Sequence, residues 1–234
     1  MPEPLDAAGR SAAPGLVPDE PGAAAPLPLG MSAALVGGYR WIEQALYELL
    51  GSWVGATPLP AVQVFLDGQS ARHAWHAQLF ADRLPVLAGA DPDGLTRPPV
   101  PAGTVLAALA GHDTPGEDGA AGPQGVLPRL AGLYRVVLPR LVVTYGRHLA
   151  AASEATDGPL IRALRLVLAD EVEDWHAGER LVQRLVTRPH DVAAVYASQQ
   201  RLESLVVNAS VASGLVPFPT VTRVDGGSVG RDGG

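Results

Sequence analysis

The segment Ala61–Leu84, AVQVFLDGQSARHAWHAQLFADRL, decides the fold, because it has the apolar periodicity of one long amphipathic helix. Its packed face is formed by residues that recur at spacings of four and three: Val62, Leu66, Gln69, His73, His76 and Phe80. The ends of this face are apolar, whereas its centre is Gln, His, His. The segment therefore predicts a helix that carries a polar layer into the core.

The two histidines in that layer need partners. Burying an imidazole costs free energy unless it finds a hydrogen-bond partner, a carboxylate or a metal ion. His73 and His76 are three residues apart on one face, so both can bind the same metal ion. The alternative is a pair of core histidines that are satisfied by hydrogen bonds alone, and both interpretations are open.

Four further segments have helical apolar stripes, and no β-hairpin pattern occurs, so we expect an all-α fold. Pro139 lies inside one of these helices and predicts a kink, because proline has no backbone N–H. The four segments run over about Gly38–Val54, Pro128–Ala152, from a cap at Thr156 or Asp157 to Val186, and Asp191–Ala209.

A long segment rich in proline and glycine, residues 85–127, separates the first two helices from the next two, with a short apolar piece at Thr104–Ala110. This order is typical of a bundle with one long crossover connection, and a flexible insertion between two up-down hairpins is the alternative. We expect one helical domain over residues 34–212. A disordered Ala/Pro/Gly-rich leader, 1–33, and a disordered tail, 213–234, flank it.

The composition of the chain argues against several classes of function. A net charge of −7 without a basic stripe argues against nucleic-acid binding. The sequence has no membrane-length apolar run and no signal-peptide pattern, so we expect a cytoplasmic protein. Cysteine is absent, which excludes thiolate ligands, and no phosphate-binding, dinucleotide or nucleophile-elbow motif occurs. A metal ion would therefore depend on histidines and carboxylates.

Carboxylates on two other helices fall at the depth of the histidines, when depth is counted from one end of the bundle at about 1.5 Å per residue. Glu171 lies inside the apolar stripe of its helix and Asp174 lies at the edge of that stripe. Glu43 lies in the broad apolar arc of the first helix. The predicted metal ligands are therefore His73, His76, Glu171, Asp174 and Glu43.

Other polar residues of the layer are weaker candidates. Glu173 and His176 form a Glu-x-x-His pattern, but Glu173 points away from the apolar stripe and His176 lies to its side. We rank both below Glu171 and Asp174, although a rotation of the helix would reverse that order. The residues expected to line a pocket or join a polar network are Gln69, Tyr134, Arg140 and Tyr145.

Three segments resemble the ferritin-like superfamily of four-helix bundles: YRWIEQALYELL with Glu43, ARHAWHA with the two histidines, and LADEVEDWHAGE. The resemblance covers roughly Gly38–Val186, and the segments are also similar to uncharacterised actinobacterial ferritin-like proteins. It implies a ferritin-like bundle with one long crossover. The segment Asp191–Ala209 would be an additional helix that docks on the bundle or, alternatively, mediates a homodimer.

The chain departs from the di-iron members of that superfamily, which use one Glu from each of two helices and Glu-x-x-His from each of the other two. His73 stands where a Glu is expected, and Pro128–Ala152 carries no carboxylate, with Arg140, Thr144 and Tyr145 at that depth. We therefore expect a mononuclear or degenerate site. One divalent ion, iron or manganese ahead of zinc, would serve an oxidoreductase acting on a small organic substrate.

Metal-free alternatives remain open. The carboxylates can pair with His73, His76 and Arg140 in a buried ionic network that fixes the packing. Tyr134 and Tyr145 would then fill the core. Such a protein would be a ferritin-like binding or structural protein, and its partner, a small molecule or another protein, is not identified by the sequence.

Overall fold

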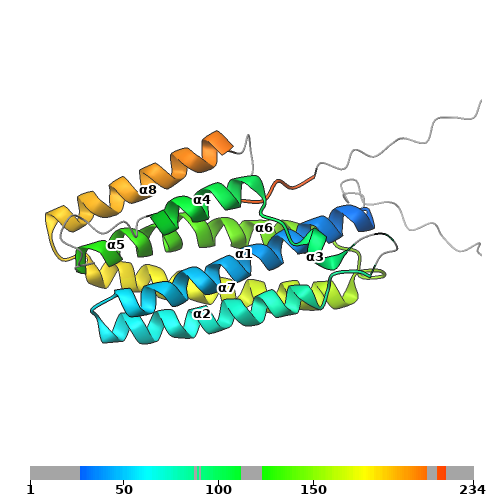
Figure 1. Ribbon diagram of the computed structural model, residues 1–234, viewed down its shortest axis with the longest axis horizontal. Coiled ribbons are helices and arrows are strands. Elements are labelled where there is room, and N and C mark those ends of the chain that lie inside the picture. The colour runs from blue at the N-terminus through cyan, green and yellow to red at the C-terminus, as the bar shows by residue number, and fades with distance from the viewer. Residues whose placement is uncertain (1–26, 87–88, 90, 112–122, 210–214, 220–234) are drawn as a thin grey trace, which may run out of the picture.

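The computed structural model describes residues 27–86, 89, 91–111, 123–209 and 215–219, and its regular structure there is entirely helical (Figure 1). The predicted all-α fold class is confirmed. The elements are α1 (Leu29–Ala56), α2 (Pro60–Ala81), α3 (Pro92–Leu95), α4 (Val100–Ala110), α5 (Pro123–Gly132), a π-helical turn η2 (Leu133–Val137), α6 (Leu138–Ala151), α7 (Gly158–Leu185) and α8 (Pro189–Ala209).

Helices α1 and α2 form a closely packed hairpin. Pro60 occupies the first turn of α2, where its missing N–H would have no partner in any case. The two helices are also tied by a side chain, because Ser70 Oγ donates a hydrogen bond to the carbonyl oxygen of Tyr47 over 2.8 Å. Gly51 leaves room for Ser70, since an added Cβ would lie 3.3 Å from its hydroxyl oxygen.

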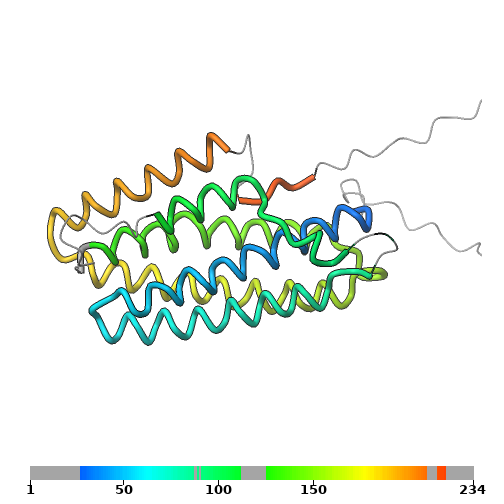
Figure 2. The backbone as a smooth tube through the Cα atoms, in the orientation of Figure 1, coloured from blue at the N-terminus to red at the C-terminus, as the bar shows by residue number. Residues whose placement is uncertain are grey.

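The second half of the chain supplies the other long helices. Figure 2 shows that α4 leads the chain back along the molecule, so that α5, η2 and α6 run in the same direction as α2. Helix α7 then returns antiparallel to α6 and packs against it. Helix α8 lies on α5 and α4, which is the docked position expected for the additional helix.

The helix that contains Pro139 has a local irregularity just before the proline. Pro139 has no N–H to donate to the carbonyl oxygen of Arg135, one turn earlier. The chain forms the π-helical turn Leu133–Val137 at this position, and α6 continues from Leu138. The irregularity predicted as a kink therefore takes the form of a widened turn.

The segment 85–127 contains more helix than the sequence predicts. Helix α4 extends over Val100–Ala110, and α5 begins at Pro123. Pro101 lies in the first turn of α4, where proline is compatible with a helix, so it begins this helix and does not interrupt it. The apolar piece at Thr104–Ala110 is the C-terminal part of a longer helix, one face of which is buried.

The two segments predicted to be disordered, 1–33 and 213–234, each include residues that are ordered. Helix α1 begins at Leu29, so residues 29–33 are helical. In the predicted tail, Leu215 and Val216 are buried, and the Ala102 N–H donates to the Leu215 carbonyl oxygen over 3.1 Å. The other residues of both predicted segments, apart from 27–28 and 217–219, lie outside the described part of the chain. Within the described part, no helix has the length and apolar character to cross a membrane.

Candidate metal centre

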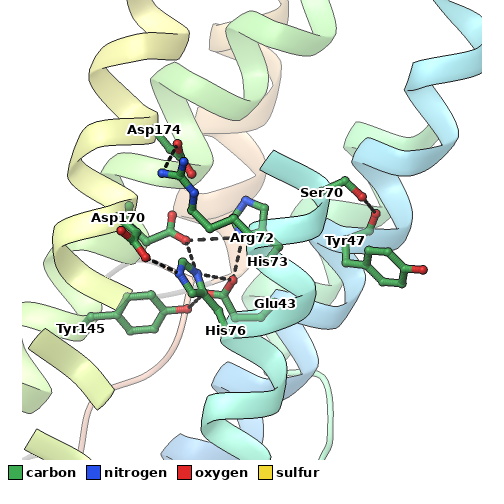
Figure 3. Close-up of polar contacts among 10 residues, drawn as sticks. Glu43, Tyr47, Ser70, Arg72, His73, His76, Tyr145, Asp170 and Asp174 are labelled. Carbon is green, nitrogen blue, oxygen red and sulfur yellow. Dashed lines mark hydrogen bonds and ion pairs between the residues drawn. The ribbon is translucent and has the colours of Figure 1, made fainter. Parts of the chain in front are cut away.

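Four buried side chains from three helices meet in the core. Glu43 comes from α1, His73 and His76 come from α2, and Glu171 comes from α7. One potential ligand atom from each lies within 4.8 Å of the others, and all four residues are 0% exposed. Figure 3 shows Glu43 and the two histidines pointing toward one another. The structure thus brings together four of the five residues predicted as ligands.

The helices hold these side chains through ordinary core packing. Glu43 lies between buried Ile42 and Leu46 on α1, so its carboxylate shares the face that packs against α2. The histidines are almost one turn apart on α2, with ring planes perpendicular at 89° and ring centres 6.0 Å apart. Glu171 occupies the buried face of α7, one turn after Val167.

Each histidine presents its Nδ1 atom to both carboxylates. His73 Nδ1 lies 2.6 Å from Glu43 Oε2 and 3.4 Å from Glu171 Oε1. His76 Nδ1 lies 3.4 Å from Glu43 Oε2 and 3.2 Å from Glu171 Oε1. The four atoms therefore form a closed ring in which nitrogen and oxygen alternate.

These separations fit four ligand atoms around one small cation. Ligand atoms about 2.0–2.1 Å from a tetrahedral ion are separated from one another by about 3.3 Å. Three of the four nitrogen–oxygen separations are 3.2–3.4 Å. The fourth, between His73 and Glu43, is a direct hydrogen bond of 2.6 Å, which would lengthen once its proton is displaced.

Several polar atoms of the group are buried without a hydrogen bond. Both carboxylate oxygens of Glu171 and the Nδ1 atom of His76 have no hydrogen-bond partner among the described residues. Buried polar atoms of this kind are uncommon, because desolvation is not compensated. A divalent cation bound by one atom of each residue would contact His76 Nδ1 and a Glu171 oxygen, and would neutralise the charges of Glu43 and Glu171.

Two outer contacts orient the ligands. The Tyr145 hydroxyl on α6 donates to Glu43 Oε1 over 2.5 Å, which leaves Oε2 facing the histidines. His76 Nε2 lies 3.1 Å from Asp170 Oδ2 on α7. A histidine that donates its Nε2–H to a carboxylate presents the lone pair of Nδ1, and metal-ligating histidines are commonly held in this way.

Opposite charges in the group displace the pKa values of Glu43 and His76 in opposite directions. Burial alone would raise the pKa of Glu43, but the charge and hydrogen bond of His73 and the proximity of His76 outweigh it and lower that pKa to about 2. Burial alone would lower the pKa of His76, but the nearby carboxylates of Glu171 and Glu43 raise it to about 11. Without a cation, Glu43 is therefore ionised and His76 is protonated at neutral pH.

The pKa values of the other two residues are raised. Burial opposes a charge on His73, but the carboxylates of Glu171 and Glu43 outweigh it and raise its pKa. The pKa of Glu171 is raised by burial and then by the nearby charge of Glu43, against the attraction of both histidines. A cation beside Glu171 would therefore favour its ionised form.

Asp174, the fifth predicted ligand, lies beside the group and not within it. Its side chain is buried, and its Oδ1 atom accepts a hydrogen bond from Arg72 Nη1 over 2.9 Å. Burial raises the pKa of Asp174, and Arg72 opposes this rise. Nearby, Gln69 accepts a hydrogen bond from the buried Tyr134 hydroxyl, so these two predicted network residues contact each other.

The residues ranked lower on α7 point away from the group. Glu173 and His176 are exposed, and the His176 ring stacks on Trp175 with ring centres 5.3 Å apart. The Glu-x-x-His pattern in this segment therefore does not converge on the buried histidines. The apolar stripe, which favoured Glu171, was the better guide to orientation.

Arg140 lies outside the buried layer, so the prediction that it pairs with the core carboxylates is wrong. Its guanidinium pairs with Glu203 on α8 and donates to the carbonyl oxygen of Val136 over 2.9 Å. Both charged side chains of that pair keep partial contact with solvent, at 23% and 30% exposure. Such a position avoids the desolvation cost that the buried layer would impose on a guanidinium.

Sequence reasoning missed two residues next to the group, Asp170 and Arg72. Asp170 contacts His76 from α7, and Arg72 covers Asp174 from α2. A signal for both existed: Asp170 and Asp174 are four residues apart, as are Arg72 and His76, so each pair shares one helix face.

Comparisons with known proteins identify no relative from which the role of the site could be inferred. The chain matches no protein-family model, no curated protein and no solved structure.

Proposed function

We propose that this protein binds one divalent metal ion through Glu43, His73, His76 and Glu171 and uses it as a non-haem oxidoreductase acting on a small organic substrate. The observation that carries the proposal is the convergence of two imidazole nitrogens and two carboxylate oxygens from three helices at one buried point. The unpartnered oxygens of Glu171 support it, because no described hydrogen-bond donor satisfies them.

The ligand set favours iron or manganese ahead of zinc for such a function. Two imidazoles and two carboxylates suit all three ions. Zinc is usually tetrahedral, so four protein ligands would complete its coordination. Iron and manganese accept more ligands, which leaves positions for a substrate or dioxygen. A redox function therefore fits iron or manganese better.

We further propose that the fold is a diverged ferritin-like bundle. The support is the pair of hairpins, α1–α2 and α6–α7, joined by a connection that returns along the molecule (Figure 1). The arrangement also explains why we propose one ion and not two. Helix α6 contributes Tyr145 to the site and no carboxylate, so a second ion would lack ligands from that side.

A metal-free binding or structural protein is the second candidate, and one observation favours it. His73 and Glu43 form a direct hydrogen bond of 2.6 Å, so part of the group is already satisfied without a cation. In this case the two histidines and two glutamates would form a buried ionic layer that fixes the register of α1, α2 and α7.

Metal analysis of the purified full chain distinguishes the two candidates. The protein would be produced with added iron, manganese or zinc, and the metal content per chain would be measured. We expect about one ion per chain, lost in a His73→Ala/His76→Ala variant and retained in a His176→Ala variant, whose imidazole is exposed on α7. Circular dichroism would verify that both variants are folded. Substoichiometric metal that is unchanged in the double variant would favour the metal-free candidate.

A further inference from the structure

One polar contact of the four ligands, among those described, leads to a side chain that reaches the surface. The ligands and Tyr145 are fully buried. Of the described side chains that form a hydrogen bond or ion pair with the ligands from outside the group, Asp170 alone is partly exposed, at 29%. The contact between Asp170 and His76 therefore links the buried group to a side chain that reaches solvent.

This contact belongs to a polar seam between two antiparallel helices. The α2–α7 seam is formed by Arg72 and His76 on α2 and by Asp170 and Asp174 on α7. His76 pairs with Asp170 at 3.1 Å, and Arg72 pairs with Asp174 at 2.9 Å, one helical turn away (Figure 3). The Arg72 side chain is 32% exposed, so it covers the buried Asp174 from the solvent side.

We propose that the α2–α7 seam is the route by which a divalent cation reaches the buried ligands, with Asp170 as its first carboxylate and the Arg72–Asp174 ion pair as a latch. This inference rests on the proposed metal-binding function. It adds where the ion passes and which side chains control the rate.

Asp170 has the position and the charge for this role. Its partly exposed carboxylate attracts a hydrated cation, and charges at the mouth of a site raise association rates. It also contacts the outer nitrogen of His76, whose inner nitrogen faces Glu43 and Glu171 at 3.4 and 3.2 Å. The His76 ring therefore lies between Asp170 and the two glutamates, and in the proposed route rotation of that ring opens the path.

Arg72 has the opposite effect on the same path. Its guanidinium places a positive charge beside the approach of a cation, and its bond to Asp174 holds α2 against α7. Removal of this side chain takes away both the repulsion and the ion pair. Arg72 touches none of the four ligands through any hydrogen bond or ion pair described, so its loss should affect the rates more than the final affinity.

Kinetics separate a route from a purely orienting role. A residue that controls passage changes the association and dissociation rates in the same direction and leaves Kd nearly unaltered, because the bound state is the same. A residue that only orients His76 changes the stability of the bound state, and such effects appear mainly in the dissociation rate.

The experiment is stopped-flow mixing of the folded full-length chain with Co²⁺, whose visible absorption changes when nitrogen and oxygen ligands replace water. Arg72→Gln should accelerate association and dissociation several-fold together, with Kd nearly constant. Asp170→Asn, which keeps an oxygen beside His76, should slow association about tenfold. Glu173→Gln and Arg180→Gln are matched controls, because they make the same charge changes at exposed positions of α7, and they should leave both rates unaltered.

Each other outcome has a defined meaning. Association rates of Asp170→Asn and Arg72→Gln equal to those of the parent chain would overturn the route while leaving the metal site intact. An Asp170→Asn effect confined to dissociation would also overturn it, because Asp170 would then only orient His76. Absence of any Co²⁺ signal in the parent chain would overturn the proposed function itself, and the route with it.

Discussion

Tyr145 and Glu43 form a buried hydrogen bond of 2.5 Å that determines which carboxylate oxygen is available to the histidines. The phenol occupies Oε1, so Oε2 is the atom that faces His73 and His76. A carboxylate held on one side in this way is oriented before a cation arrives. This contact links α6, which contributes no ligand of its own, to the site on α1 and α2.

We therefore expect Tyr145→Phe to weaken metal binding. Loss of the hydroxyl frees Glu43 to rotate, and removal of a hydrogen bond to a ligand typically lowers metal affinity about 10- to 100-fold. Titration calorimetry with Mn²⁺ or Zn²⁺ would measure the change. Tyr134→Phe is the matched control, because its hydroxyl bonds to Gln69 and not to a ligand. Equal affinities of the two variants would show that the Tyr145 hydroxyl does not orient Glu43.

Metal binding should become stronger as the pH rises. The pKa of His76 is about 11 without a cation, and that of His73 is raised, so an ion must displace a proton from each protonated imidazole. The affinity should increase about tenfold per pH unit for each proton displaced, from about pH 6 to pH 8. Calorimetry in buffers of different ionisation enthalpy would count the released protons. An affinity that does not vary over this range would show that the histidines are not the ligands.

Close packing beneath the site should make Gly178 hard to replace. An added Cβ at Gly178 would overlap the ring of Tyr134, whereas one at Gly146 on α6 would meet no atom within 4 Å. We expect Gly178→Ala to lower the free energy of unfolding by at least about 2 kcal/mol through overpacking. Gly146→Ala should raise it by about 0.5–1 kcal/mol through helix propensity. Urea denaturation would test both, and a neutral Gly178→Ala would mean that the tyrosine moves readily.

A third buried histidine, His148, should make the fold sensitive to acid. Burial lowers the pKa of His148 to about 4, only partly opposed by Asp157. Its ring contacts Ser32 Oγ at 3.2 Å. The folded state thus favours neutral His148, so its contribution is fully present above the unfolded pKa of about 6.5 and is lost as the pH falls toward about 4.

The corresponding variant is His148→Gln, which retains a hydrogen-bonding group near Ser32. The loss in the parent chain amounts to about 3 kcal/mol at most. The variant should therefore lose less of its free energy of unfolding between about pH 6.5 and pH 4 than the parent chain. Denaturant titrations at both pH values would measure the difference. An identical pH dependence in the two chains would show that folding does not lower the pKa of His148.

Sequence periodicity correctly predicted the features that depend on which face of a single helix a residue occupies. The stripe through His73 and His76 placed both imidazoles in the core, and the stripe of α7 separated Glu171, which is buried, from Glu173, which is exposed. The depth of Glu43, counted in residues from one end of the bundle, placed it level with the two histidines, where the structure also has it. These inferences succeed because an α-helix has a fixed rise and rotation per residue.

The features that were not predicted depend on contacts between helices. Arg140 pairs with Glu203 on α8, and a position on α6 alone does not reveal which neighbour is in reach. Asp170 flanks the site because α2 and α7 are antiparallel at a particular register. Helix α4 was underestimated because its prolines lie at its first turn, where they are tolerated.

The π-helical turn Leu133–Val137 has a consequence for how the chain can change by insertion and deletion. A turn of this kind holds one residue more than an α-helical turn, and one residue corresponds to about 100° of rotation. Because the widened turn accommodates the extra residue in about the same total rotation, deletion of a single residue here would restore a regular helix and leave α6 in its present orientation relative to α5. Tyr145 would still face Glu43, and α5 would keep its place against α8. The widened turn is thus a position at which the helix can hold one residue more or one fewer without moving the half that packs on α8 or the half that contributes to the polar core.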